Sequence, residues 1–325
     1  MESKARIAAI GAYVPPRVLT NNELSTMVET SDEWIVQRTG IRERRIAAAD
    51  VYASDLGALA VEDLVRRHPG SLERVDFLIA ATFTADFLTP ATAAVIHGRM
   101  GLPASVGTYD LNAACAGFAH ALIVANAYVT AGVCRTVLVV ATEALSKITD
   151  YSDRATCVLF GDGAVALLIE RDENEPAFLG CSFGTDGANA DKLYTTSLST
   201  RCNGQQLPIK GYFWQDGRAV YNYTIKVIPE AVRALCRNAA LELSDIDWFV
   251  PHSANLRIIQ SICEKLPFPF EKTLTSVERF GNTSSASIPL ALWLGLEQGR
   301  LKKGDRVALY GFGGGLNHAG VIVRW

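Results

Sequence analysis

DLNAACAGFA, residues 110–119, has the pattern of a buried strand end, a tight turn of small residues and the first turn of a helix. The helix is predicted to continue through HALIVANAYVTAG and to stop at Gly132. A cysteine at a helix start feels the positive end of the helix dipole, so we expect a lowered pKa and a nucleophilic thiolate at Cys115. The alternative is a buried, inert cysteine in an alanine-rich helix, because free cysteine is among the most buried residue types.

Segments around this stretch recur in the second half of the chain, in the same order and at offsets between 167 and 171 residues. The matched pairs are LERVDFLIA from Leu72 with LSDIDWFVP from Leu243, the helices ending at Gly132 and Gly299, and VLVVA (137–141) with VALYG (307–311). The repeat predicts an α/β fold made of two similar βαβ-type halves related by a pseudo-twofold axis.

The charged stretch RDENEP (171–176) is the predicted boundary between these halves. We therefore expect an N-terminal half over residues 1–173 that carries the cysteine and a C-terminal half over residues 174–325. The expected strands are 5–11, 76–81, 107–111, 135–141, 164–170, 246–251, 273–278, 306–311 and 318–324, and the expected helices include one from Asn21, 53–67, 90–100, 221–240, one after Asn255, and 285–298. Residues 185–217, rich in Gly, Thr, Ser and Asn, are predicted to be an insertion that lies over a surface or a cleft.

The repeat also predicts where the chemistry lies. An offset of 167 pairs Cys115 with Asn282, and an offset of 171 places His252 at the carboxyl end of a strand. Ligands of open α/β sheets bind at the carboxyl ends of strands, so we expect these three residues to meet at one site.

A thiolate beside an imidazole and an amide is a set suited to acyl transfer. Cys115 would attack a thioester carbonyl, while His252 and Asn282 would donate hydrogen bonds to the oxygen on which charge develops. The alternatives are a structural histidine and, at Asn282, a turn residue or helix N-cap. The glycines at 313–315 allow the backbone to approach a ligand closely and to present an N–H to an oxyanion. They open no helix, which argues against a dinucleotide site, and the absence of G-x-S-x-G disfavours a serine α/β-hydrolase.

Composition narrows the class of protein further. The 325 residues are 49% hydrophobic and 20% charged, as in globular proteins, and the net charge of −3 gives no overall attraction to nucleic acid or to acidic membranes. We expect no signal peptide and no membrane-spanning segment. Seven scattered cysteines without a C-x-x-C pair argue against zinc and dithiol sites and favour a reducing, cytoplasmic compartment.

Several stretches resemble the motifs of one known family: DLNAACAGF, VPHSANLRI, ERFGNTSSASIP, YGFGGG, TSDEWIVQRTGIRERR and DRATCVLFGDGA. They are similar to β-ketoacyl-[acyl-carrier-protein] synthase III, the initiating condensing enzyme of type II fatty-acid synthesis. The resemblance runs from about residue 7 to the C-terminus and keeps the family's order. It implies the thiolase fold, with two similar halves in five αβαβα layers, and a homodimer.

The resemblance also implies a ping-pong decarboxylating Claisen condensation. Cys115 would take the acyl group of an acyl-CoA, and His252 and Asn282 would stabilise the enolate that malonyl-carrier protein forms when it loses CO₂. The backbone N–H groups of Cys115 and Gly314 would form the oxyanion hole, and Phe312 would pack beside the site. No cofactor is implied, because CoA and the carrier's phosphopantetheine arrive as parts of the substrates.

Five further positions match substrate contacts of the family. Trp34, Arg38 and Arg154 match the positions that hold the CoA nucleotide, with the indole stacked on adenine. Asn255 matches the residue near the pantetheine arm, and Arg257 matches a basic position that meets the acidic helix of the carrier protein.

Three positions depart from the family's pattern. Asn222 stands where many relatives have a lysine for the carrier protein, which leaves the strength of docking open. Thr89 stands where many relatives have a phenylalanine that closes the acyl pocket across the dimer, so we expect a pocket roomier than acetyl needs unless Phe87 or Leu88 fills it. Leu316 replaces the usual aromatic residue after the third glycine.

Three other functions compete with the condensing enzyme. The same fold could serve as an acyltransferase or starter-unit synthase of a secondary-metabolite pathway. A cysteine hydrolase also has Cys, His and Asn in this chain order, but the repeat and the absence of C-G-S-C-W argue against it. A non-enzymatic binding protein would be expected to lose at least one of the three residues, and all three are present.

Overall fold

The computed structural model describes residues 2–208 and 211–325 and contains two large mixed β-sheets. The five-stranded sheet has the order β1 (Ala5–Tyr13), β7 (Gly163–Arg171), β6 (Thr136–Glu143), β4 (Phe77–Ala81) and β5 (Gly107–Leu111). The four-stranded sheet has the order β13 (Trp248–Pro251), β14 (Arg306–Gly313), β15 (Asn317–Arg324) and β8 (Phe178–Thr185). Each sheet thus draws its strands from one half of the chain.

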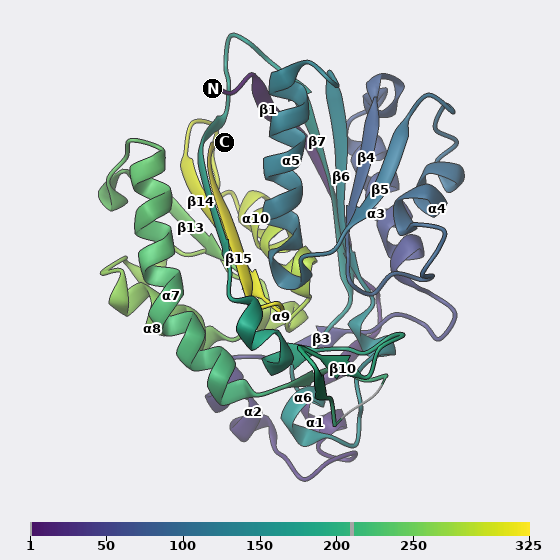
Figure 1. Cartoon of the computed structure of the whole chain (residues 1–325), viewed down its shortest axis with the longest axis vertical. Coiled ribbons are helices and arrows are strands. Elements are labelled where there is room, and N and C mark those ends of the chain that lie inside the picture. The colour runs from purple at the N-terminus through teal and green to yellow at the C-terminus, as the bar shows by residue number, and fades with distance from the viewer. Residues whose placement is uncertain (1, 209–210) are drawn as a thin grey trace.

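Helices lie outside and between the two sheets, which gives the five-layer αβαβα arrangement of the thiolase fold (Figure 1). The outer helices are α3 (Ala53–Arg67) and α4 (Thr92–Arg99) against the first sheet, and α7 (Gly217–Asn238) and α8 (Leu256–Lys265) against the second. The central layer holds α5 (Gly117–Ala131) and α10 (Ser287–Glu297), whose apolar side chains join the facing sides of both sheets in one core.

The predicted repeat is confirmed by the sheet topology. In each half a strand runs parallel to its matched neighbour, β4 with β6 and β13 with β14, and an antiparallel strand follows. The second half has no strand that matches β5, and a single bridge between Phe249 and Thr273 takes its place. The predicted strand over 273–278 is therefore wrong, because the chain turns directly into α9 (Val277–Phe280).

Helix α5 ends with Gly132 in the left-handed conformation, as the sequence predicts. By length and composition alone, the segment Ala114–Ala131 could cross a membrane. Half of it is buried inside the protein, and it stands between the two sheets (Figure 1), so its apolar surface serves the core.

The smaller elements gather near one end of the sheets. They are β2 (Val18–Thr20), α1 (Asn21–Leu24), α2 (Asp32–Thr39), β3 (Glu43–Arg45), α6 (Arg154–Cys157), β9 (Leu193–Tyr194), β10 (Arg201–Cys202), β11 (Gln205–Gln206) and β12 (Trp214–Gln215). The helix predicted from Asn21 is only one turn long, and Thr20 rather than Asn21 caps it. Short 3₁₀ turns include η2 (Ala114–Ala116) and η7 (Ser284–Ala286), which precede the two central helices.

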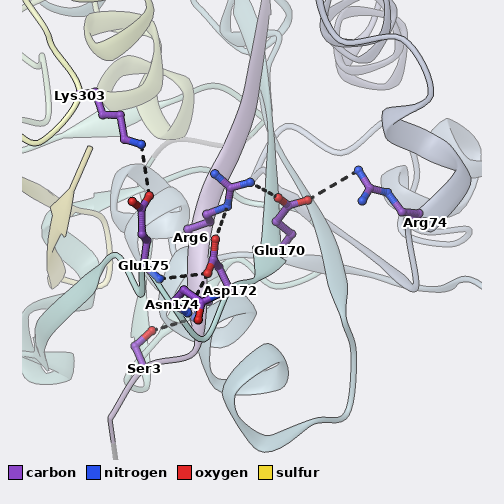
Figure 2. Close-up of polar contacts among 9 residues, drawn as sticks. Ser3, Arg6, Arg74, Glu170, Asp172, Asn174, Glu175 and Lys303 are labelled. Atoms are coloured by element: carbon purple, nitrogen blue, oxygen red, sulfur yellow. Dashed lines mark hydrogen bonds and ion pairs between the residues drawn. The ribbon is translucent and has the colours of Figure 1, made fainter.

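The charged stretch between β7 and β8 is tied to both halves (Figure 2). Arg6 of β1 pairs with Glu170 at 2.6 Å and with Asp172 at 3.1 Å, and Lys303 before β14 pairs with Glu175 at 3.2 Å. The Asp172 carboxylate also accepts from the backbone N–H groups of residues 174 and 175. These contacts fix the path of the connection where the sequence predicts the boundary.

Candidate active site

Cys115, His252 and Asn282 line one cavity of about 440 Å³. Cys115 lies in η2, His252 follows β13, and Asn282 follows α9, so three separate segments supply the three side chains. All three are nearly buried, with exposed fractions of 5%, 2% and 8%. The structure therefore brings together the residues that the sequence predicts to meet.

The residue pairing predicted within the repeat is wrong by three positions. The turns η2 and η7 and the helices that follow them are related by an offset of 170, which pairs Cys115 with Ser285 and Asn112 with Asn282. The two asparagines make the same turn, since each Oδ1 accepts the N–H of the residue two positions on, at 3.2 and 2.9 Å. Asn282 thus reaches the site as the partner of Asn112.

The same two turns share an unusual backbone conformation. Ala114 and Ser284 precede Cys115 and Ser285, and they have φ angles of 44° and 49°. This left-handed conformation costs a non-glycine residue about 1 kcal/mol. In each half it carries the chain from the strand edge into the central helix.

The amide of Asn282 is oriented by its turn. Because its Oδ1 accepts the Ser284 N–H, its Nδ2 group is the end that remains to donate into the cavity. The arrangement supplies a neutral hydrogen-bond donor beside Cys115.

His252 is a neutral imidazole whose ring proton is placed by Ser287. The Ser287 Oγ lies 2.7 Å from Nδ1 and accepts the N–H of Ser253 at 3.3 Å, so its own hydrogen can go to Nδ1. That leaves the ring proton on Nε2, a second neutral donor. Burial lowers the pKa of His252 to about 3, so the ring stays uncharged at neutral pH.

The expectation of a lowered pKa at Cys115 is wrong. Burial raises the pKa of the thiol to about 12 and outweighs the hydrogen bonds to sulfur from Ser284 and from the N–H groups of Cys115 and Gly314. The Ser284 hydroxyl lies 3.4 Å from Sγ. The resting cysteine is therefore a thiol, and any reaction at sulfur must first remove its proton.

The glycine-rich end of β14 presses against the cysteine. A Cβ at Gly313 would lie 2.7 Å from the Cβ of Cys115 and 2.9 Å from its sulfur, so only glycine fits there. The close approach also brings the Gly314 N–H to the sulfur. Phe312 is buried and meets the His252 ring edge to face, with centroids 5.3 Å apart.

The residues matched to CoA contacts lie at the mouth of the cavity. Trp34 and Arg38 of α2 line it, and Arg154 of α6 places its guanidinium 4.9 Å from the Trp34 ring. A base stacked between indole and guanidinium would need two spacings of about 3.5 Å, so Arg154 would have to move aside for a base to enter.

Asn255 and Arg257 also lie at this mouth. The Asn255 side chain caps α8 by accepting the N–H of Arg257 at 2.9 Å, and it donates to the carbonyl of Arg38 at 3.1 Å. It thus joins α8 to α2 across the entrance, while Arg257 is exposed beside it.

The insertion over 185–217 covers the cleft, as predicted, in the part of it that the structure describes. Four of its residues line the cavity: Leu193, Phe213, Gln215 and Gly217.

The three departures from the family pattern lie outside the Cys115 cavity. Thr89 is on an exposed loop, next to a second cavity of about 830 Å³ that Phe87 and Leu88 line. Leu316 is buried along a separate groove, so it does not touch the space around the cysteine. Asn222 is exposed on α7.

Three polar residues next to the site were not predicted from the sequence: Glu143, Ser284 and Ser287. A signal for Glu143 is present, since this acid ends the apolar strand TVLVVATE. For Ser284, the signal is its position in the repeat: with the offset of 170 it is equivalent to Ala114, the residue directly before Cys115.

Within residues 2–208 and 211–325, no three His, Cys, Asp or Glu side chains gather closely enough to hold a metal ion.

Comparison with known proteins gives a consistent result. A family model described as 3-oxoacyl-[acyl-carrier-protein (ACP)] synthase III matches residues 109–187, and the model of its C-terminal part matches residues 236–325. A β-ketoacyl-[acyl-carrier-protein] synthase III 2 of Halalkalibacterium halodurans is 54% identical over 99% of this chain and 97% of its own. A relative of the same description from Bacillus subtilis is 52% identical over 99% of both chains. A crystal structure of β-ketoacyl-[acyl carrier protein] synthase III from Thermus thermophilus superimposes with a TM-score of 0.94, at 47% identity and 98% coverage of both chains.

Proposed function

The chain belongs to the β-ketoacyl-[acyl-carrier-protein] synthase III family and is a condensing acyltransferase of fatty-acid synthesis, and we propose that Cys115, His252 and Asn282 carry its reaction. The observation that carries this assignment is their convergence on one cavity, whose lining the thiol shares with two neutral hydrogen-bond donors. Acyl-CoA and malonyl-acyl-carrier protein are the two substrates.

In the first half-reaction, the Cys115 sulfur attacks the carbonyl carbon of acyl-CoA and CoA leaves. The N–H groups of Cys115 and Gly314 already point at the sulfur, so an oxyanion formed beside it finds two donors in place. Trp34, Arg38 and Arg154 bind the CoA nucleotide at the mouth, and Asn255 lies along the pantetheine arm.

In the second half-reaction, malonyl-carrier protein loses CO₂ and its enolate attacks the acyl group on Cys115, giving 3-oxoacyl-carrier protein. The Nε2–H of His252 and the Nδ2 of Asn282 hold the enolate oxygen. Neutral donors suit this task, because a carboxylate in their place would repel the enolate. Phe312 packs against His252 and fixes the plane of its ring.

The carrier protein docks at the mouth through Arg257. Because Asn222 stands where many relatives have a lysine, this surface has one positive charge fewer at that position. The exposed Lys226, one turn further along α7, adds a positive charge in the same groove as Asn222. An acidic helix of the carrier protein is the complementary partner.

We assign the enzyme to the cytoplasm as a homodimer that needs no cofactor besides its substrates, with halves at 1–173 and 174–325. Seven free thiols suit a reducing compartment. Strand β5 is an open edge whose residues are half-buried, and the exposed Phe87 and Leu88 lie near it, which suits burial against a second copy. Thr89 then faces the partner's acyl pocket as its gate.

In the direct test, the protein is mixed with an acyl-CoA and malonyl-carrier protein, and the CO₂ released and the products formed are measured. We expect one CO₂ and one 3-oxoacyl-carrier protein for each CoA released. If CoA is released and the product is an ester or a free acid, the enzyme catalyses another acyl transfer. If no acyl-CoA is accepted, the acyl donor is an acyl-carrier protein.

The rate of the condensation step, plotted against pH, should show no inflection caused by titration of His252. The pKa of this ring is lowered from 6.5 to about 3, so it is already neutral above about pH 4 and its Nε2–H donor persists as the pH rises. Enzyme that has first been acylated on Cys115 is mixed with malonyl-carrier protein, and CO₂ release in one turnover is followed from about pH 5.5 to 8.5. A tenfold change centred near pH 6.5 would contradict a neutral donor.

The gate is tested by Thr89→Phe. We expect the rate of acylation by long or branched acyl-CoAs to fall by about tenfold or more, because a bulkier side chain fills the pocket, with little change for acetyl-CoA. Intact-protein mass spectrometry over a ladder of acyl-CoAs measures both enzymes under the same conditions. If the dependence of the acylation rate on chain length is unchanged, Thr89 does not line the acyl pocket.

A further inference from the structure

Arg44, the middle residue of β3, is an arginine that the fold buries completely. Its guanidinium donates to the carbonyl of Leu19 at 3.2 Å, to the Oδ1 of Asn21 at 2.7 Å and to the carbonyl of Val158 at 2.7 Å. Burial lowers the pKa of this group to about 10, so it keeps its charge at neutral pH. A buried cation held by neutral oxygens is costly to maintain, which points to a role beyond stability.

One arm of the guanidinium reaches helix α2 through Asn21. The Oδ1 of this buried amide accepts from Arg44, so its Nδ2 is left to donate, and it does so to the Oδ1 of Asp32 at 2.8 Å and to the carbonyl of Ile41 at 2.9 Å. Asp32 begins α2, and Ile41 directly follows the residue that caps its C-terminus. A single amide, oriented by Arg44, therefore holds both ends of the helix.

Helix α2 forms part of the mouth of the Cys115 cavity, to which it contributes Trp34 and Arg38. In Figure 1 it lies beside α1 and β3 at one end of the molecule. Loss of the Arg44 guanidinium would leave the Oδ1 of Asn21 buried without its donor, and the amide would no longer have one preferred orientation. The position of the mouth contacts thus depends on a side chain that does not line the cavity.

The other arm of the guanidinium reaches Asn282. It ends on the carbonyl of Val158, the residue that caps the C-terminus of α6. The chain that follows pairs with Asn282, whose N–H donates to the carbonyl of Leu159 at 2.8 Å and whose carbonyl accepts the N–H of Gly161 at 3.1 Å. Both backbone groups of Asn282 are therefore held by a segment that Arg44 anchors.

The apolar stem of Arg44 packs against the same two segments. A Cβ at Gly161 would lie 3.0 Å from the Cβ of Arg44, and a Cβ at Gly281 would lie 3.2 Å from it. Glycine at both positions lets the segment after α6 and the turn before Asn282 close on the stem. The arginine thus meets the Asn282 turn through its stem as well as through its guanidinium.

We propose that Arg44 is a positioning residue that keeps the CoA contacts at the mouth and the amide of Asn282 in register. It touches no substrate, and it acts through Asn21 on one side and through Val158 on the other. The proposal rests on the proposed function, in which α2 contributes to CoA binding and Asn282 stabilises the enolate.

The first arm is tested by Asn21→Ala in single-turnover acylation of Cys115, followed by intact mass with acetyl-CoA and with acetyl-pantetheine. Acetyl-pantetheine has the same reacting thioester but no nucleotide, so its reaction does not use the contacts on α2. We expect the half-saturation concentration of acetyl-CoA to rise about tenfold and that of acetyl-pantetheine to stay unchanged. Condensation should also be unchanged, because the bond from Arg44 to Val158 remains.

Arg44→Met removes both arms and keeps an apolar stem. We expect the same loss toward acetyl-CoA. In addition, enzyme that has first been acylated on Cys115 should release CO₂ from malonyl-carrier protein about tenfold more slowly or worse, because a displaced Asn282 amide holds the enolate oxygen less well. Arg44→Lys should recover only part of the two effects, since one ammonium group cannot replace a planar fork of donors to three oxygens.

Arg300→Met is the matched control. Arg300 also donates to two backbone carbonyls, those of Glu271 at 3.1 Å and Thr273 at 3.4 Å, but it lies outside the Cys115 cavity. It should equal the unaltered enzyme in both half-reactions. In every variant the amplitude of acylation counts the folded sites, so a loss of stability lowers the amplitude and leaves the half-saturation concentration and the rate per site unchanged.

The outcomes separate this proposal from the proposed function. If Arg44→Met lowers only the amplitude of acylation, Arg44 serves stability and the proposal is overturned. If Arg44→Met yields no folded enzyme, Arg44→Lys and Asn21→Ala decide, and unchanged constants in both overturn it.

Two results with the unaltered enzyme bear on the proposed function instead. If peptide mapping finds no acyl group on Cys115, that function fails. If acetyl-CoA reacts no better than acetyl-pantetheine, only its nucleotide contacts fail, and the rate of CO₂ release in the Arg44 variants still supports or overturns the link to Asn282.

Discussion

Replacing Cys115 by alanine is expected to abolish acylation by acyl-CoA and to lower condensation by about 10⁴-fold or more. The sulfur is the atom that would hold the acyl group between the two half-reactions, and alanine offers no nucleophile in its place. Intact mass after incubation with acyl-CoA measures the first effect, and release of 3-oxoacyl-carrier protein measures the second.

Cys134→Ala is the matched control, because it removes another buried thiol of the same half that lies outside the cavity. We expect it to acylate and condense like the unaltered enzyme. Condensation that survives in Cys115→Ala would show that the nucleophile is assigned wrongly, whereas an equal loss in both variants would trace the effect to stability.

Asn282→Ala is expected to keep acylation within a few-fold and to lower condensation by about 10²–10³-fold, the usual effect of removing one oxyanion donor. The reason is that its Nδ2 would meet the enolate oxygen, which exists only in the second half-reaction. Separate single-turnover measurements of acyl transfer and of CO₂ release distinguish the two steps.

Asn282→Asp is the sharper variant of the pair. An aspartate keeps the oxygen that accepts the Ser284 N–H, and so keeps the turn beside Cys115, but it cannot donate and its charge repels an enolate. It should be at least as poor in condensation as Asn282→Ala, and it should acylate normally. If both half-reactions fall equally in both variants, Asn282 holds the turn and has no part in stabilising the enolate.

Much of this fold could be predicted from the sequence because its signals are local. The strand at 107–111 and the helix at 53–67 have the predicted bounds, since apolar periodicity and turn residues mark both ends of each. The strand predicted over 273–278 is absent because its pairing depends on a neighbouring strand, and only one isolated bridge, at Thr273, forms with that strand. A short apolar stretch of sequence does not indicate which neighbouring strand it will pair with.

The candidate site divides in the same way. Sequence motifs and the repeat were enough to predict that Cys115, His252 and Asn282 meet, because each follows a recognisable strand or turn. The offset within the repeat was misjudged by three residues, since Asn112 and Asn282 are recognised as equivalent only through their matching turns.

The sequence by itself determined the two halves, the order of their elements and the identity of the three residues that meet in the cavity. The tertiary structure alone decided their protonation. Cys115 begins a helix, as predicted, yet burial from both sheets raises its pKa instead of lowering it. Likewise Glu143 is only an acid at a strand end until the fold removes water from it and raises the pKa of its carboxyl to about 7. Proton affinity depends on desolvation and on contacts between residues far apart in the chain, and neither is written in local sequence.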